Sequence, residues 1–363
     1  MRALTVIAML SVIAAGGSAA TFDELAAPAA AARRANNIPE AIELYRQAVQ
    51  LRASWAEGWW FVGTLSYATY QYNGCESAFN EFVKLDDQRA LAWSLLGLCE
   101  FETGQYDPAL DHLRQGLAAG KELAPEVEAG VRFHYGLLLS RAGLFDRGMQ
   151  ELERYARGGA HEPMLIEGLG LNALHERWLP KEVPGDRLDA VTQAGTATCF
   201  WILGETAKAE AGFRELAKEY PTLVGVHYLF GTYLSYARPE EAVPELRREL
   251  QMNPANADAE ARLALLLMHA NDLPDALPYA KKAAAEQPPD ALVEYAYGEV
   301  LMGTGELRPA IVSLETAERL APAVLEYHMA LASAYSRAGR YEDARHERQV
   351  SVGMAAGESN SSE

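Results

Sequence analysis

The sequence has few cysteines, few basic side chains and no long apolar run beyond its first residues. Three cysteines among 363 residues form an odd number, which argues against a framework of disulfides. After the apolar run at 4–15, no stretch reaches the roughly eighteen apolar residues of a membrane-spanning helix. The 50 acidic and 32 basic residues give a formal net charge of −18, which disfavours nucleic acid and anionic membrane surfaces as partners.

Motifs of catalysis and metal binding are also lacking. The histidines are dispersed, no pair brackets a glutamate at helical spacing, and no Cys-x-x-Cys occurs. No glycine-rich phosphate loop follows a strand, because no segment has a strand pattern. We therefore predict no catalytic residues, no metal site and no cofactor, and a protein that is not an enzyme.

The N-terminus has the pattern of an export signal. A basic start at Arg2 precedes the apolar run, and small residues lead up to Ala20. This arrangement predicts a signal peptide over 1–20, cleaved after Ala20. The mature chain is then periplasmic or secreted and does not insert into a membrane. The alternative is an uncleaved membrane anchor.

Small residues recur every 34 positions, which indicates an internal repeat. One ladder contains Ala29, Gly63 and Gly97, and a second contains Ala264, Gly298 and Ala332. A fixed period of this length means that one supersecondary unit is copied along the chain.

The unit that starts at Ala90 shows the repeat most clearly. Apolar residues at spacings of three, four and seven predict two helices joined by a turn at 104–106, each with one buried face. Gly97 and Ala109 are small, so the two helix axes can approach closely.

This unit resembles the tetratricopeptide repeat, whose first helix carries Trp, Leu, Gly and Tyr and whose second carries Ala, Phe, Ala and Pro. The match extends along nearly the whole mature chain. Four prolines stand where a second helix must stop: Pro221, Pro254, Pro288 and Pro322. The resemblance implies an all-α, right-handed superhelical solenoid of about nine antiparallel helix pairs with one irregular seam.

The period is interrupted once, which suggests a division of the chain. An N-terminal repeat block covers 21–161, an irregular helical seam covers 162–187, and a C-terminal repeat block covers 188–355. The seam contains an apolar helix at 164–174 and then a proline-containing connection. The polar tail at 356–363 is expected to be disordered.

The cysteines lie inside these helical segments. Cys75 takes a repeat position that is alanine at Ala41 and Ala109, so we expect Cys75, Cys99 and Cys199 to pack as small buried hydrophobes. A Cys75–Cys99 disulfide in an oxidising compartment is the alternative.

The resemblance also implies where a partner binds. In this family the first helices line a concave face, and positions beside the small residue point into the groove. Large aromatic side chains, which concentrate at binding hot spots, fill eight such positions: Trp60, Tyr67, Phe101, Phe133, Trp201, Tyr228, Tyr236 and Tyr295. The alternative for each ring is packing between adjacent first helices.

The family's best-known groove grips a C-terminal carboxylate with lysine, asparagine and arginine. This chain has no counterpart, because Trp60, Thr64, Ser94, Leu98 and Phe133 stand at the matching positions. Apolar anchors of the partner would therefore have to supply the affinity.

Together these patterns predict a protein–protein interaction scaffold of the cell envelope. It would bind a protein or peptide segment with apolar anchors in an aromatic-lined concave groove. One alternative is a ligand-binding or enzyme-accessory protein with a seam pocket lined by Trp178, Trp201 and a charged residue. A second alternative is a structural spacer that associates with itself.

Overall fold

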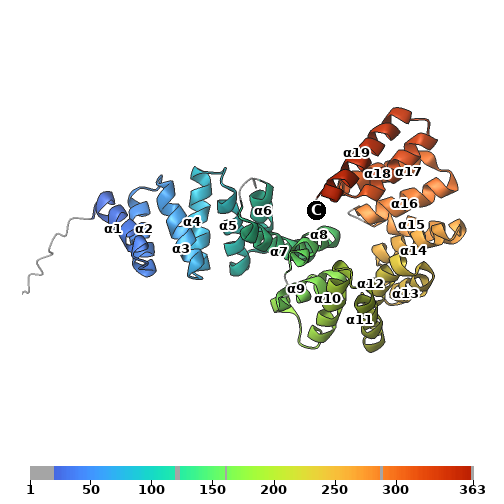
Figure 1. The fold of residues 1–363 in the computed structure, drawn as a ribbon, viewed down its shortest axis with the longest axis horizontal. Helices are drawn as coiled ribbons and strands as arrows, with labels where there is room; N and C mark the ends of the chain where they lie inside the picture. Colours follow the sequence, from blue (N-terminus) through green and yellow to red (C-terminus); the bar gives the residue numbers. More distant parts are fainter. Residues whose placement is uncertain (1–19, 119–122, 160–161, 287–288, 361–363) are drawn as a thin grey trace, which may run out of the picture. The chain divides into compact units, whose positions relative to one another are not determined.

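The computed structural model describes residues 20–118, 123–159, 162–286 and 289–360 (Figure 1). Within these ranges the chain forms nineteen α-helices and one short 3-10 helix, and no strand. The predicted all-α class is therefore confirmed. The chain divides into two compact units, 1–138 and 139–363, and each is described by itself.

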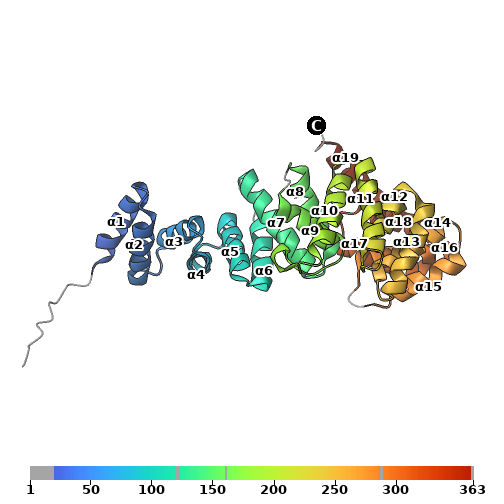
Figure 2. The ribbon, with the colours of Figure 1, turned by 90° about the horizontal axis from the view of Figure 1, so that it is seen from below.

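The first unit consists of consecutive helices that pack as pairs, with α1 against α2, α3 against α4 and α5 against α6 (Figure 2). The boundary between the units falls inside α7. The bounds are α1 (Phe22–Arg34), α2 (Ile38–Leu51), α3 (Ala56–Ala68), α4 (Tyr72–Leu85), α5 (Ala90–Thr103), α6 (Tyr106–Ala118) and α7 (Pro125–Arg141).

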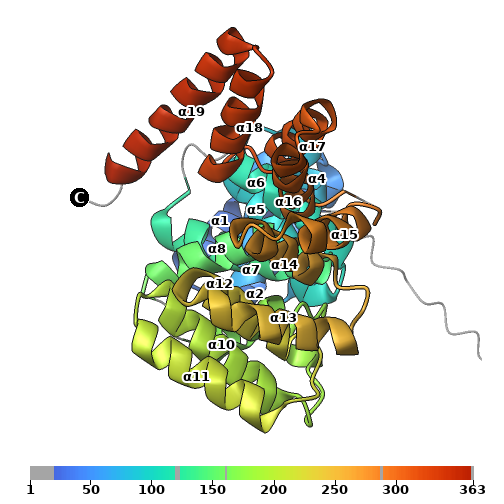
Figure 3. The ribbon, with the colours of Figure 1, turned by 90° about the vertical axis from the view of Figure 1, so that its right-hand side faces the viewer.

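The second unit repeats this arrangement with five pairs, α10/α11, α12/α13, α14/α15, α16/α17 and α18/α19 (Figure 3). It also contains α8, α9 and the 3-10 helix η1. The bounds are α8 (Phe145–Arg157), α9 (Pro163–Ala173), η1 (Pro180–Glu182), α10 (Leu188–Ile202), α11 (Thr206–Glu219), α12 (Val226–Ala237), α13 (Pro239–Met252), α14 (Ala257–His269), α15 (Leu273–Ala283), α16 (Ala291–Thr304), α17 (Leu307–Leu320), α18 (Leu325–Arg337) and α19 (Tyr341–Asn360).

The ladder of small residues explains why the helices pair. A Cβ atom added at Gly97 would lie 2.7 Å from Cγ of Leu113 on the second helix of its pair. The equivalent distance from Gly298 to Leu314 is 2.6 Å. No larger side chain fits at these contacts without moving the helices apart. The 34-residue period is therefore the repeat of one interhelical contact.

The seam is a close contact between helices. The apolar helix expected at 164–174 is α9, and it packs against α10. A Cβ added at Gly195 would lie 1.8 Å from the carbonyl oxygen of Ile166, so the two backbones touch directly. The seam lies inside the second unit, whereas the division between the units lies in α7.

The two ends of the chain are only partly described. The predicted signal peptide covers 1–20, and residues 1–19 lie outside the described part. α19 continues to Asn360 and so extends into the segment assigned to a tail. Among the described helices, none combines the length and the apolar character needed to span a bilayer.

The structure corrects the expectation for two of the three cysteines. Cys75 on α4 and Cys99 on α5 form a disulfide, and both are fully buried. Their Cα atoms lie 6.1 Å apart, a distance that a disulfide spans. The prediction of packed thiols is wrong here because α4 and α5 belong to consecutive pairs, whose stacking brings the two cysteines together. Cys199 is free and buried, as expected.

Candidate functional site

Four of the eight predicted groove residues lie in the second unit, and two of them, Tyr228 and Tyr236, lie beside Arg262 on α14. The Arg262 Nε donates a hydrogen bond to the Tyr228 hydroxyl at 3.3 Å, and the guanidinium lies near enough to Tyr236 to interact with it electrostatically. The Tyr236 ring lies 5.8 Å from the Trp201 ring. On α16, Tyr295 is close enough to Tyr236 for the two phenols to interact electrostatically. The first helices of four successive pairs thus contribute to one group.

The exposure of these side chains differs widely. Tyr236 is 71% exposed, Trp201 and Tyr295 are half-buried, and Tyr228 is only 5% exposed. Tyr295 packs against Tyr327 of the next first helix, with ring centroids 4.9 Å apart. A partner can therefore reach Tyr236 and the accessible parts of Trp201 and Tyr295, whereas Tyr228 is covered.

The other four predicted residues lie in the first unit. Trp60 packs against Phe79 and Phe82, with the Arg89 guanidinium 3.7 Å above its ring. Tyr67 is half-buried beside Tyr72.

Three of the eight rings are buried within the stack. Phe101 and Phe133 are each 6% exposed, and Tyr228 is 5% exposed. The Phe101 ring meets His134 of the next first helix at 4.8 Å. These rings pack between helices, which was the alternative for each predicted groove residue.

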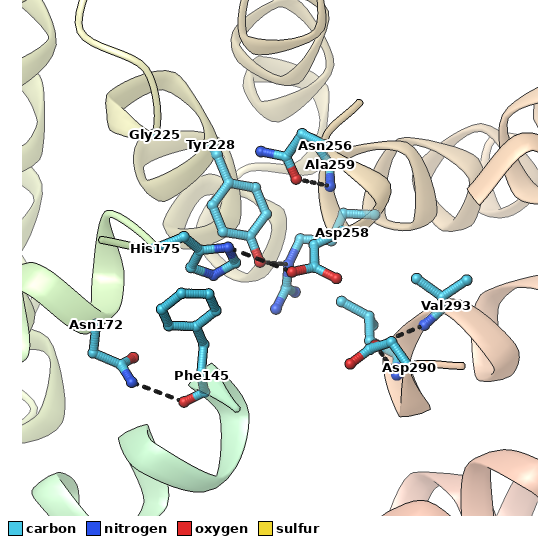
Figure 4. A network of polar contacts seen from close by, with 12 residues as sticks. Phe145, Asn172, His175, Gly225, Tyr228, Asn256, Asp258, Ala259, Asp290 and Val293 are labelled. Atoms are coloured by element: carbon cyan, nitrogen blue, oxygen red, sulfur yellow. Dashed lines mark hydrogen bonds and ion pairs between the residues drawn. The ribbon is translucent and has the colours of Figure 1, made fainter. Parts of the chain in front are cut away.

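A polar constellation that the sequence analysis did not identify lies beside Tyr228 (Figure 4). His175 follows α9 in a left-handed backbone conformation, with φ of 57°. Its ring stacks on Phe145 at 4.3 Å and also contacts Tyr228 at 4.7 Å. Its Nδ1 lies 3.5 Å from a carboxylate oxygen of Asp258.

Burial shifts both groups toward their neutral forms. It lowers the pKa of His175 to about 3, because a charged imidazolium is poorly solvated there. Burial raises the pKa of Asp258 to about 7, and the carboxylates of Asp290 and Asp146 add to this shift. His175 is therefore neutral at pH 7, so its contact with Asp258 is not an ion pair.

These residues border a pocket of about 380 Å³ at the end of the seam. The carboxylate of Glu249 closes one side, where it accepts hydrogen bonds from the backbone N–H groups of Gly225 and Tyr228 at 3.0 and 3.3 Å. Other walls come from Phe145, Leu174, His175, Glu176, Arg177, Val224, Asn253, Ala255, Asn256, Ala257 and Asp258.

The pocket differs from the seam pocket expected from the sequence. Trp178 and Trp201 do not border it, because both pack against the hydrophobic core of the second unit. The residues that do border it come from helix ends far apart in sequence.

The face around Arg262 combines apolar and polar groups. In the described ranges no three His, Cys, Asp or Glu side chains are grouped to hold a metal ion. The site instead combines aromatic rings and one guanidinium, which together can contact an apolar side chain and a hydrogen-bond acceptor.

Comparison with known proteins identifies the repeats. The tetratricopeptide repeat family matches residues 76–125 and 233–291. No curated protein matches the sequence.

Solved structures show limited similarity. One is MamA, residues 41 to the end, from Desulfovibrio magneticus RS-1: 21% identity, TM-score 0.38, over 48% of this chain and 98% of that one. Another is the Cut9–Hcn1 hetero-tetramer of the APC/C: 11% identity, TM-score 0.43, over 92% of this chain and 87% of that one. These scores are too low to support an inference about function.

Proposed function

Because this chain is a tetratricopeptide repeat protein, we propose that it is a scaffold that binds a segment of a partner protein in an aromatic-lined concave groove. The binding site is the face of the second unit formed by Trp201, Tyr236, Arg262 and Tyr295. The family supports protein binding in general, and the convergence of these side chains supports this face in particular.

The gathering of Tyr228 and Tyr236 around Arg262 carries the proposal. Arg262 forms no ion pair with any carboxylate of the described residues, yet it is half-buried. The hydrogen bond to Tyr228 holds the guanidinium in place and leaves further N–H donors available. A partner would place an apolar side chain against Tyr236 and Trp201, and an acceptor oxygen on Arg262.

The energetics of such a site depend on a few rings. Burial of apolar surface by the partner contributes about 25 cal/mol per Å² to the binding free energy. The entropic cost of ordering the bound segment reduces this gain. Rings already held by Arg262 and by neighbouring helices lose little freedom on binding, which favours affinity. The groove would therefore act as a preformed surface.

The cell envelope is the proposed location. The export-type pattern at 1–20 supports it, and so does the Cys75–Cys99 disulfide, because structural disulfides persist in oxidising compartments. Mass spectrometry of the chain purified from the periplasm of a bacterial host tests this. We expect a mature N-terminus at Thr21 and an intact disulfide. A full-length, reduced chain in the cytoplasm would contradict the proposal.

The partner site is tested by affinity capture with the full chain from envelope extracts, followed by binding measurements with the purified partner. Tyr236→Ala and Arg262→Gln should each weaken binding at least tenfold. Tyr341→Ala is the matched control, since Tyr341 is equally exposed, at 68%, but lies on α19 outside the group. Equal affinity of all four proteins would exclude this face. Light scattering without a partner tests self-association separately.

A further inference from the structure

One backbone turn recurs after nine helices in the described ranges, and a tyrosine occupies it once. At each turn a residue just after the helix has a positive φ. Five of these residues are glycines, two are asparagines and one is a histidine: Gly104, Gly143, Gly204, Gly305, Gly339, Asn36, Asn271 and His175. The ninth is Tyr70, with φ of 59°.

The turn itself is unchanged by the tyrosine. The backbone N–H of Gln71 donates to the carbonyl of Ser66 at 2.8 Å, as Gln105 does to Glu100 in the next pair. Glycine has no Cβ to clash in this conformation, and asparagine tolerates it. Tyrosine has neither advantage. Tyr70 therefore destabilises a turn that glycine would form more easily.

Packing does not explain the presence of this tyrosine. Tyr70 is 79% exposed, and its nearest ring, that of Tyr72, lies 6.2 Å away in an edge-to-face arrangement. A residue held in an unfavourable backbone conformation without burial is typical of functional sites.

The surroundings of Tyr70 indicate what it binds. Tyr67 and Tyr72 lie 6.2 Å apart, and we call Tyr67, Tyr70 and Tyr72 the tyrosine cluster. Burial raises the pKa of Tyr67 and of Tyr72, and the carboxylate of Glu102 raises both further. Glu102 lies on α5, which packs against both α3 and α4, and so can act electrostatically on these phenols. It is exposed and forms no ion pair with the residues that the structure describes.

We propose that the tyrosine cluster and Glu102 receive a lysine or arginine side chain of the partner segment. The faces of tyrosine rings attract cations, and Glu102 supplies a full negative charge beside them. The net charge of −18 favours approach of a basic segment over an acidic one. This inference rests on the proposed scaffold function, because it specifies a second contact for the same class of partner.

The test uses the full chain and a displayed library of random 12-residue peptides. Peptides that bind the wild-type chain and lose binding to Tyr70→Gly should be enriched in lysine and arginine. They should bind Tyr70→Gly and Glu102→Gln at least tenfold more weakly than the wild type. Asn36→Gly is the matched control, since it makes the same change in the preceding turn, and it should bind as the wild type does.

Thermal unfolding separates binding from folding. We expect the melting temperature of Tyr70→Gly to be equal to or above that of the wild type, because glycine relieves the turn. A lower melting temperature would show that Tyr70 serves the fold, and would overturn the inference.

The peptide results also separate this inference from the proposed groove. Peptides sensitive to Tyr236→Ala but not to Tyr70→Gly would overturn the role of the tyrosine cluster and leave the groove intact. Selected peptides without basic residues, or no selected peptide at all, would also overturn it. Sensitivity to Tyr70→Gly alone would support the tyrosine cluster and count against the groove.

Discussion

The Nδ1 atom of His227 lies 2.6 Å from a carboxylate oxygen of Glu245. Its Nε2 lies 3.0 Å from the carbonyl oxygen of Pro221, so both nitrogens face acceptors and both must carry hydrogen. His328 is placed in the same way, 2.7 Å from Glu347 and 2.9 Å from the carbonyl of Pro322. In two separate pairs, a histidine thus links the first helix to its second helix and to the preceding loop.

This arrangement predicts stability that decreases as the pH rises. The bond to Glu245 raises the pKa of His227 against the effect of burial. For His328, burial lowers the pKa, but the bonds to Glu347 and Pro322 together raise it above the ordinary 6.5. Each histidine contributes its full stabilisation below about pH 6.5, the pKa of histidine in the unfolded state. This stabilisation is lost as the pH rises through the raised pKa of the folded state. We expect about 1 kcal/mol from each histidine.

The measurement compares the wild type with a His227→Gln/His328→Gln double variant by thermal unfolding. The difference in melting temperature should be larger at pH 6 than at pH 9. A difference that is the same at both values would show that the imidazoles are not charged in the folded state.

Asp258, which lines the pocket beside His175, gives a second pH-dependent prediction. Its pKa is raised from 3.8 to about 7, so the folded state favours the protonated acid. The fold therefore loses stability as the pH rises from about 4 through 7. Asp258→Asn keeps the shape without the charge. It should stabilise the protein by about 2 kcal/mol at pH 8, which is less than the full pKa shift implies because the Asp258 side chain is 26% exposed.

Chemical denaturation at pH 8 and at pH 4 checks this prediction. The gain from Asp258→Asn should disappear at pH 4, where the acid is already protonated in most molecules. Asp275→Asn is a suitable control, because that side chain is 60% exposed. A loss of stability in the Asp258 variant at pH 8 would contradict the burial argument.

The Cys75–Cys99 disulfide should stabilise the first unit locally. It closes a loop with a sequence separation of 24, for which the loss of chain entropy in the unfolded state corresponds to about 3 kcal/mol. In a repeat array each pair contacts only its neighbours, so the effect should remain near α4 and α5.

Hydrogen exchange with and without reductant measures this local effect. Reduction should lower the protection of α4 and α5 amides and leave α16 and α17 unchanged. A Cys75→Ala/Cys99→Ala variant should no longer respond to reductant, whereas Cys199→Ala should respond as the wild type does. Protection of α4 and α5 that is insensitive to reductant would argue against the bond.

The sequence predicted those parts of the fold that depend on local patterns. The ladder of small residues fixed the helix pairs, because Gly97 and Gly298 each meet one leucine of the paired helix. The seam helix was expected at 164–174 and is found as α9, Pro163–Ala173. Such features arise from periodicity within one unit, which a single sequence displays directly.

Features that depend on the stacking of one helix pair on the next were not predictable in the same way. His175 and Asp258 meet only because the end of α9 reaches the start of α14. Tyr228 and Tyr236 are both on α12 and both were predicted to face the groove. Yet Tyr228 is buried under His175 while Tyr236 is 71% exposed. Two residues with one pattern differ because different neighbours cover the two ends of the helix.

The contact between α9 and α10 gives the last prediction, because it leaves no room for any side chain. A Cβ at Gly195 would lie 1.8 Å from the Ile166 carbonyl oxygen and 2.9 Å from the Gly170 backbone nitrogen. Both obstacles are backbone atoms, so neither can rotate away. Gly195→Ala should destabilise the second unit by about 3 kcal/mol or more.

Gly130→Ala in α7 is the control, since nothing lies within 4 Å of a Cβ added there. A helical glycine in open space should gain up to about 1 kcal/mol when it becomes alanine. Helix propensity alone would make alanine stabilising at both positions. A loss of stability at Gly195 together with a gain at Gly130 would therefore show that the close approach of the helices decides the effect at Gly195. Thermal unfolding of both variants decides the matter. A stabilised Gly195→Ala protein would mean that α9 and α10 do not touch, and the seam would then be a loose connection instead of a packed one.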